Sequence, residues 1–259
     1  MPLSVVSWNV NSLAARLPQV IDWLRANRPD VLLLQELKMV REAFPHDAFA
    51  ELGYDAAVHG QKTYNGVAIV SRLRLEDVQQ GLGSTDTDPG QARYIEALVD
   101  GRVRIASVYV PNGEDVGTSK YDYKMGFYKN LETLVRGIIA SDEAYIIGGD
   151  FNVAASPLDT HDPEGWKDRI LFSEPERAAL RRLFAAGLID TFRTLHPTRR
   201  EYSWWDYRAG SFPQNKGARI DYVLASPQAL SGLIHARIDS APRANERPSD
   251  HVPVIAQWG

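Results

Sequence analysis

The amino-acid sequence predicts an α/β fold in which helices lie outside the sheets. Residues 3–34 have the pattern of a strand, a helix and a second strand, the basic repeat of α/β proteins. Residues 121–139 form a long amphipathic pattern that leads directly into the apolar segment 144–153. Several apolar segments also end in polar side chains, and α/β proteins usually place their chemistry at the carboxyl ends of strands. We therefore expect a functional site at one end of the sheets.

The first strand–helix–strand unit places two polar side chains at strand ends. Leu3 to Trp8 is mostly apolar and is followed by Asn9, and apolar residues then recur at helical spacing from residue 13 to residue 24. Val31 to Leu34 is an apolar run typical of a buried strand, and Glu36 follows it closely. Asn9 and Glu36 are expected side by side at one edge of a sheet, although Glu36 alone could simply end its strand.

Residues 41–92 predict a short helix, two strands and an exposed loop. The helix is expected at Arg41 to Leu52, and the strands at Tyr54 to Val58 and at Gly66 to Ser71. Residues 79–92 are rich in Gly, Asp, Thr and Pro, so they predict the loop.

The next segment predicts a β-hairpin that ends in polar residues. Tyr94 to Val99 and Val103 to Val110 favour strands, and Asp100-Gly101 between them favours a tight turn. The second strand leads to Tyr109 and Asn112. Tyr109 could equally belong to the core, and Asn112 could be a turn residue after a proline.

The segment 144–153, Ala-Tyr-Ile-Ile-Gly-Gly-Asp-Phe-Asn-Val, has the pattern of a buried strand that ends in a polar tip. Because side chains alternate along an extended chain, Asp150 and Asn152 are expected to point the same way, with Phe151 turned into the core. A carboxylate beside an amide at a strand end suits catalysis or metal binding. A simple turn is the alternative, since Gly, Asp and Asn are ordinary turn residues.

The last third of the chain predicts one more helix and the remaining strands. Ser173-Glu-Pro-Glu176 has the pattern of a helix start, with an early proline and a capping acid three residues after serine, and the helix should reach Gly187. Strands are expected at Arg219 to Ala225, at His235 to Ser240 and at Val252 to Trp258.

Asp250 and His251 form a second polar tip before the closing strand. A carboxylate on one ring nitrogen of a histidine fixes the tautomer and stabilises the imidazolium, and Asp221 could supply it. Such an imidazolium suits contact with an anionic transition state. A structural or solvated role for His251, and an ion pair of Asp221 with Arg219, are the alternatives.

An aromatic run at residues 202–208 includes Trp204 and Tyr207. Such a run is most often packing. Interleaved with Arg208 and Lys216, however, these aromatic side chains could also stack on bases or sugars.

Composition limits the class of protein. The 259 residues, 44% hydrophobic and 24% charged, contain no long linker or repeat, so a single domain over residues 1–259 is expected. With no cysteine, disulfides and thiolate metal sites are excluded, and a metal would be held by oxygen or imidazole, which favours Mg²⁺ or Mn²⁺. The net charge of −4 argues only mildly against nucleic acid as a partner, because a local basic surface can bind it.

The sequence has neither the basic start and apolar region of a signal peptide nor an apolar run approaching the roughly 20 residues that span a membrane. It therefore predicts a soluble cytoplasmic protein. The polar strand ends supply oxygen ligands, a base and cationic contacts, which is the set that a phosphodiesterase with a hard metal ion needs.

These segments together resemble the exonuclease III type of apurinic/apyrimidinic (AP) endonuclease, within the endonuclease/exonuclease/phosphatase superfamily. The Tyr-Val-Pro-Asn-Gly segment and the aromatic run narrow the resemblance to the DNA-repair branch, and the matches cover nearly the whole chain in the family's order. The matching segments are Ser7-Trp-Asn-Val-Asn11, Leu34-Gln-Glu-Leu-Lys38, Tyr64-Asn-Gly-Val67, Val108-Tyr-Val-Pro-Asn-Gly113, Gly148-Gly-Asp-Phe-Asn-Val153, Gly187-Leu-Ile-Asp-Thr-Phe192, Tyr202-Ser-Trp-Trp-Asp-Tyr-Arg208, Arg219-Ile-Asp-Tyr222 and Ser249-Asp-His-Val-Pro253.

The resemblance implies a four-layered α/β sandwich, with two mixed sheets packed face to face, helices outside and the site at one end. It implies hydrolysis of DNA phosphodiesters that depends on Mg²⁺ or Mn²⁺. By motif, Asp150 would activate the attacking water, Asn152 would orient it, and Tyr109 would contact the phosphate. His251, held by Asp221, would stabilise the pentacovalent transition state. The residues assigned to the metal site are Asn9, Glu36, Asp150, Asn152, Asp250 and His251.

The resemblance also implies duplex DNA with abasic sites or damaged 3′ ends as the partner of a monomeric, nucleoid-associated enzyme. Trp204 and Ile220 would line a pocket for a flipped abasic sugar, where position 218 is Ala instead of the large aromatic residue of some relatives. A superfamily enzyme acting on a phospholipid or an inositol phosphate is the alternative, which would lose the DNA-facing residues. The residues expected to contact DNA are Asn112, Lys120, Lys124, Trp204, Arg208, Lys216 and Ile220.

Overall fold

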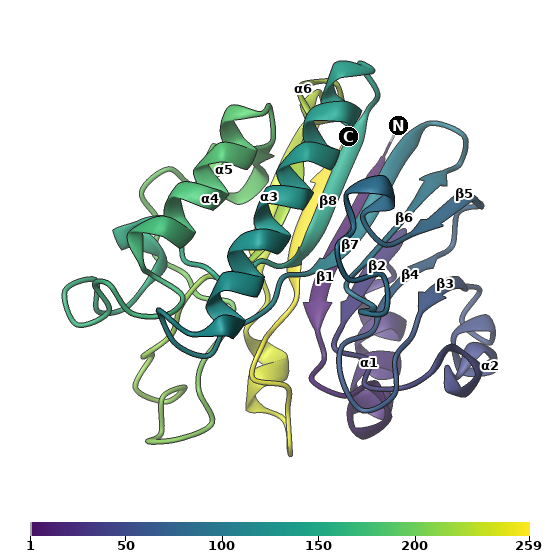
Figure 1. Cartoon of the computed structure of the whole chain (residues 1–259). Coiled ribbons are helices and arrows are strands. Elements are labelled where there is room, and N and C mark those ends of the chain that lie inside the picture. The colour runs from purple at the N-terminus through teal and green to yellow at the C-terminus, as the bar shows by residue number, and fades with distance from the viewer. Residues whose placement is uncertain (1) are drawn as a thin grey trace.

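Two six-stranded mixed sheets form the centre of the computed structural model, which describes residues 2–259 and, for Thr85, the backbone alone (Figure 1). Each sheet has one parallel pair among antiparallel neighbours. In spatial order the first sheet consists of β11 (Leu233–Ile238), β12 (Val254–Trp258), β1 (Leu3–Asn9), β2 (Val31–Gln35), β4 (Val67–Ser71) and β3 (Asp55–His59). The second consists of β5 (Leu75–Gln80), β6 (Tyr94–Val99), β7 (Val103–Tyr109), β8 (Tyr145–Asp150), β10 (Asp221–Ala225) and β9 (Ile189–Asp190).

Helices cover the outer faces of the two sheets. Helices α1 (Leu13–Asn27) and α2 (His46–Ala50) pack on the first sheet, and α3 (Ser119–Ala140) and α4 (Glu174–Ala185) pack on the second. A third apolar cluster fills the space between the sheets. The molecule is therefore the expected four-layered α/β sandwich. The shorter helical segments are α5 (Thr191–Leu195), α6 (Pro227–Leu230) and the 3₁₀ turns Arg41–Ala43, Gly83–Thr85, Pro157–Asp159 and Ala241–Ala244.

Strand register brings the polar strand ends together at one end of the sandwich. In the first sheet β1 runs parallel to β2, so that Asn9 pairs with Gln35 and lies beside Glu36. In the second sheet Asp150, the last residue of β8, pairs with Tyr109 on one side and with Asp221 on the other. The two chain termini lie at the opposite end of the molecule (Figure 1).

Two local predictions are confirmed. The turn Asp100-Gly101 joins β6 and β7, and both residues have positive φ, 52° and 64°, as a tight hairpin turn requires. Helix α4 begins after Ser173 with a capping box in which Glu176 accepts from the backbone N–H of Ser173 at 3.1 Å.

Other boundaries differ from the prediction, mostly at prolines. The helix expected at Arg41 to Leu52 is a 3₁₀ turn followed by α2, because Pro45 forces Phe44 into an extended conformation. Strand β12 begins after Pro253 and not at Val252. Strand β5 was not predicted, since its exposed pattern lacks the apolar alternation of the other strands, and it includes Gln79 and Gln80 of the expected loop.

Among the described residues, no helix is both long and apolar enough to cross a membrane.

Candidate active site

Asp150, His251 and Asp221 form a buried carboxylate–imidazole–carboxylate series. The imidazole Nδ1 lies 2.9 Å from Asp221 Oδ2, and Nε2 lies 3.7 Å from Asp150 Oδ2. The exposed fractions of the three residues are 1%, 4% and 0%. Ser203 donates its hydroxyl hydrogen to Asp221 Oδ2 at 2.6 Å and fixes that carboxylate. The predicted orientation of His251 by Asp221 is therefore present, and Arg219 pairs instead with Asp159 and Asp190.

The electrostatics of this series keep its imidazole charged. Burial opposes the charge on His251, but Asp221 and then Asp150 outweigh it and raise the pKa of the imidazole to about 10. Burial raises the pKa of Asp150 to about 7, with His251 opposing the rise and Asp221 and Glu36 adding to it. With its Nδ1 held by Asp221 and its ring protonated, His251 can present Nε2–H to an anion.

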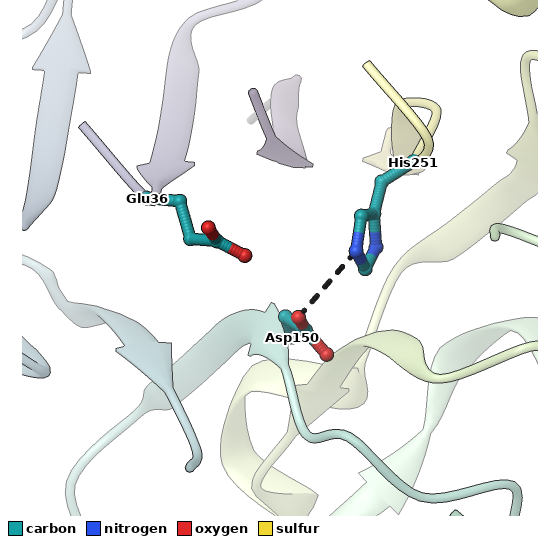
Figure 2. A group of neighbouring side chains, drawn as sticks. All are labelled: Glu36, Asp150 and His251. Carbon is teal, nitrogen blue, oxygen red and sulfur yellow. Dashed lines mark ion pairs between the residues drawn. The ribbon is translucent and has the colours of Figure 1, made fainter. Parts of the chain in front are cut away.

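Glu36 follows β2 of the first sheet and faces Asp150 of the second, and Figure 2 shows the side chains of Glu36, Asp150 and His251 pointing toward one another. One ligand atom of each lies within 4.8 Å of the others, so together they could hold a metal ion. Asn9 bridges the two carboxylates: its Nδ2 donates to Glu36 Oε1 at 2.8 Å and to Asp150 Oδ2 at 2.9 Å. To offer oxygen to a metal, the Asn9 amide would have to turn over.

Asn152 continues the site on the loop after β8. Its backbone N–H donates to Asp150 Oδ1 at 2.9 Å, and its Nδ2 lies 3.2 Å from Asp150 Oδ2. With φ of 50° Asn152 is not extended, so the strand ends at Asp150 and a turn places the amide beside the carboxylate. Asn112 donates to Asn152 Oδ1 at 3.1 Å. Strand and turn thus both contribute, and Phe151 is buried as expected.

The hydroxyl of Tyr109 is subject to the negative charges of both Glu36 and Asp150. Burial and then the negative charges of Glu36 and Asp150 raise the pKa of its hydroxyl well above the ordinary value. The Tyr109 hydroxyl is therefore protonated at neutral pH and can donate a hydrogen bond. The guanidinium of Arg93 lies over its ring, 4.9 Å from the ring centroid.

Asp250 lies beside this group and is hydrogen-bonded by two neutral donors. Trp204 Nε1 and Asn11 Nδ2 each donate to it at 3.0 Å. Burial would raise the pKa of Asp250, but His251 and these donors hold it below the ordinary value. Lys38, which the sequence reasoning did not assign to the site, lies 3.0 Å from Glu36 Oε2 and donates to Asn11 Oδ1.

The residues expected to contact DNA have unequal access to solvent. Trp204 is half-buried, whereas Arg208, Lys216 and Lys120 are exposed. Ile220 is only 1% exposed and belongs to an apolar cluster on which Trp204 and Trp166 pack. Ile220 therefore lies beneath these two tryptophans.

One expected phosphate contact is wrong. Lys124 is fully buried and paired with Glu176, so it cannot reach a phosphate on the surface. The sequence of α3 alone does not indicate that Lys124 is buried, because its acidic partner comes from another helix.

Known proteins resemble this chain over nearly its whole length. A model of the endonuclease/exonuclease/phosphatase family matches residues 6–251. The chain belongs to this family. Within the family it is of the exonuclease III type: it is 34% identical over 267 residues to exodeoxyribonuclease III of Haemophilus influenzae, with 99% of this chain and all of that protein covered.

Solved structures of the family superpose closely on this member. One is a 3′ phosphatase, NExo, from Neisseria bound to a product DNA hairpin, with a TM-score of 0.96 and 43% identity. Another is an AP endonuclease from Archaeoglobus fulgidus, with a TM-score of 0.94 and 35% identity. Each comparison covers 99% of both chains, so the likeness extends over the whole sandwich.

Proposed function

We propose that this exonuclease III-type protein is a metal-dependent DNA-repair nuclease that hydrolyses phosphodiesters in duplex DNA, 5′ to abasic sites, at 3′ ends, or both. The observation that carries the proposal is the meeting at one point of the buried carboxylate of Asp150, the charged imidazole of His251 and the carboxylate of Glu36. Together they supply a base for water, a cation for the developing phosphate charge and ligands for a metal ion.

Each polar side chain around Asp150 has a distinct role in the proposal. Asp150 takes a proton from the attacking water, and Asn152 orients that water or contacts the developing charge. His251, held by Asp221, donates from Nε2 to the pentacovalent phosphate. Tyr109, whose hydroxyl is kept protonated by burial and by the charges of Glu36 and Asp150, donates to a phosphate oxygen.

The donor set fits a hard divalent cation. Glu36 and Asp150 offer carboxylate oxygens, and Asp250 and the turned amide of Asn9 could add to them, which is the chemistry that Mg²⁺ and Mn²⁺ prefer. When bound, the metal would polarise the phosphoryl oxygen and offset negative charge. His251 is better suited to donate to phosphate, because Asp221 and Asp150 raise its pKa to about 10 and so keep its Nε2 protonated.

The DNA would lie across the end of the sandwich. Lys120 and Arg208 are exposed there, beside loops that carry Asn112 and Trp204. The relatives whose names report action on DNA support this choice of substrate over a phospholipid or an inositol phosphate.

The proposal is tested with three labelled duplexes, each incubated with Mg²⁺ or EDTA. One carries an internal abasic analogue, one a blocked 3′ end and one a plain 3′-hydroxyl end. Metal-dependent incision at the abasic site would establish an AP endonuclease, and end trimming alone would establish a 3′-phosphodiesterase or exonuclease. Inactivity on all three duplexes would contradict the proposal and make phospholipids and inositol phosphates the next substrates to assay.

A further inference from the structure

Lys124 of α3 and Glu176 of α4 form a fully buried ion pair next to the proposed active site, with exposed fractions of 0% and 0%. The Lys124 ammonium also donates to two backbone carbonyl oxygens, those of Asn152 at 2.6 Å and of Asn112 at 3.1 Å. These three acceptors match the three N–H donors of a lysine ammonium.

We propose that the Lys124–Glu176 pair positions the two loops that carry Asn112 and Asn152, and through them the carboxylate of Asp150. This inference rests on the proposed function, because it assigns a role within the same site. Lys124 touches neither substrate nor the reacting atoms, so it is a positioning residue and not a catalytic one.

The contacts form a continuous path from the ion pair to the base. The Lys124 ammonium donates to the backbone carbonyl oxygens of both Asn112 and Asn152. On their side chains, Asn112 Nδ2 donates to Asn152 Oδ1 at 3.1 Å, and Asn152 Nδ2 lies 3.2 Å from Asp150 Oδ2. Asn152 also has φ of 50°, a conformation that an L-residue adopts at some cost and that its surroundings must hold in place. Fixing the carbonyl of Asn152 therefore fixes the direction of its amide.

Glu176 holds Lys124 in place and is itself rigid. Its Oε2 accepts from the hydroxyl of Ser173 at 2.6 Å and from the Ser173 backbone N–H at 3.1 Å. Its Oε1 accepts from the backbone N–H of Leu171 at 3.2 Å as well as from Lys124. The carboxylate is thus part of the capping box of α4, so the start of that helix sets the position of the ammonium.

Gly113 shows how closely the lysine stem passes under the first loop. Its φ is +89°, and a Cβ atom at this position would lie 3.0 Å from Lys124 Cδ and 3.1 Å from Ile170 Cδ1. A glycine after Asn112 therefore lets the loop rest directly on the buried lysine.

Stability alone gives a weak reason for such a pair. Moving two charges out of water is costly, and replacing a buried ion pair by apolar residues of similar volume is often neutral or stabilising. The geometry of Lys124, which spends its remaining two donors on active-site loops, gives a functional reason instead.

The experiment uses the double variant Lys124→Met/Glu176→Leu in the full-length protein. Removing both charges together avoids an unpaired buried charge, but the Leu171 and Ser173 N–H groups lose their acceptor, so we expect a lower Tm and compare kcat per folded molecule. We expect kcat on the best DNA substrate to fall by about 10- to 100-fold with KM changed by less than about threefold, as small displacements of a catalytic constellation typically cause. The matched control is Arg104→Met/Glu96→Leu, which removes a largely buried ion pair away from the site together with the pairs of Arg104 to Asp77 and Glu143, and its kcat should stay unchanged.

A second pair of variants covers the case in which the apolar pair does not fold. Glu176→Gln keeps one acceptor oxygen, which can serve Lys124 and Leu171 or Ser173 but not both, and Lys124→Met/Glu176→Gln differs from it only in the lysine. Only the variant without the lysine should lose kcat, measured per folded molecule. Equal kcat in these two variants, or a folded Lys124→Met/Glu176→Leu protein with wild-type kcat, would overturn the inference.

The failure of this inference can be told apart from that of the proposed function. If the unaltered protein hydrolyses no DNA, the proposed function fails by itself. The side-chain amide signals of Asn112 and Asn152 in ¹H–¹⁵N spectra then still report the positioning. They should shift when Lys124 is replaced and stay in place in the Arg104→Met/Glu96→Leu control.

Discussion

At the scale of single residues, the site depends on one buried carboxylate held between an imidazole and amide donors. Asp150 is 1% exposed and accepts from Asn9 and from the backbone N–H of Asn152. We expect Asp150→Asn to lower kcat by several orders of magnitude, because an amide of the same size cannot take a proton from water. Folding should be largely kept. Turnover and thermal unfolding measured side by side test this, and near-normal turnover would refute the role of Asp150.

The charge on His251 predicts how the stability of the metal-free protein depends on pH. The pKa of the imidazole is raised from 6.5 to about 10, so the folded state holds this proton more tightly than the unfolded state does. The stabilisation is fully present below pH 6.5 and is lost as the pH rises to about 10. In EDTA, the difference in Tm between wild type and His251→Gln should therefore narrow over that range. A difference that stays constant or widens would contradict the assignment.

Residues at strand tips could be predicted from sequence, whereas partners across the fold could not. Asp150 ends an apolar strand and His251 shortly precedes one, so the pattern located them. Lys124 lies on an amphipathic helix where charged residues are usually solvated, and only the packing of α3 on α4 shows that it is buried. Lys38 likewise gave no signal, because its approach to Glu36 depends on positive φ values at both residues.

At the scale of elements, local chemistry determined what the sequence could reveal. The hairpin and the capping box depend on neighbouring residues alone, and both were predicted correctly. The pairing of strands depends on contacts between distant segments, so the order of the strands was not predicted, and only the two-sheet architecture came from the family resemblance. Strand β5 is exposed at a sheet edge and therefore lacks the apolar pattern by which strands are recognised.

The Asp100-Gly101 turn gives a prediction at this scale. Gly101 has φ of 64°, which costs a residue with a Cβ about 1–2 kcal/mol. Gly101→Ala should therefore lower the free energy of unfolding by about 1 kcal/mol. Because the turn lies at the far end of β7 from Tyr109, kcat should not change. Denaturant titration and a turnover assay test both parts, and an unchanged free energy of unfolding would exclude the strain at Gly101.

At the scale of the whole molecule, an acidic protein is proposed to bind an acidic polymer. The net charge is −4, so attraction to DNA must come from a local surface. Two of the exposed cations proposed for that surface are paired in the free protein, Lys120 with Glu114 and Arg208 with Asp206. Binding to phosphate must therefore exchange these exposed pairs for contacts with DNA, which is inexpensive because such pairs contribute little stability.

Salt dependence tests this surface directly. Each phosphate that a lysine or arginine neutralises releases counterions, so the DNA affinity should fall steeply as salt rises from about 50 to 200 mM. Lys120→Ala and Lys216→Ala should each reduce the slope of log affinity against log salt by about 1. Lys129→Ala, which removes the same charge from an exposed position in the middle of α3, should leave the slope unchanged. A flat dependence in the wild type would exclude the proposed surface, and equal slopes in all three variants would exclude the two lysines as phosphate contacts.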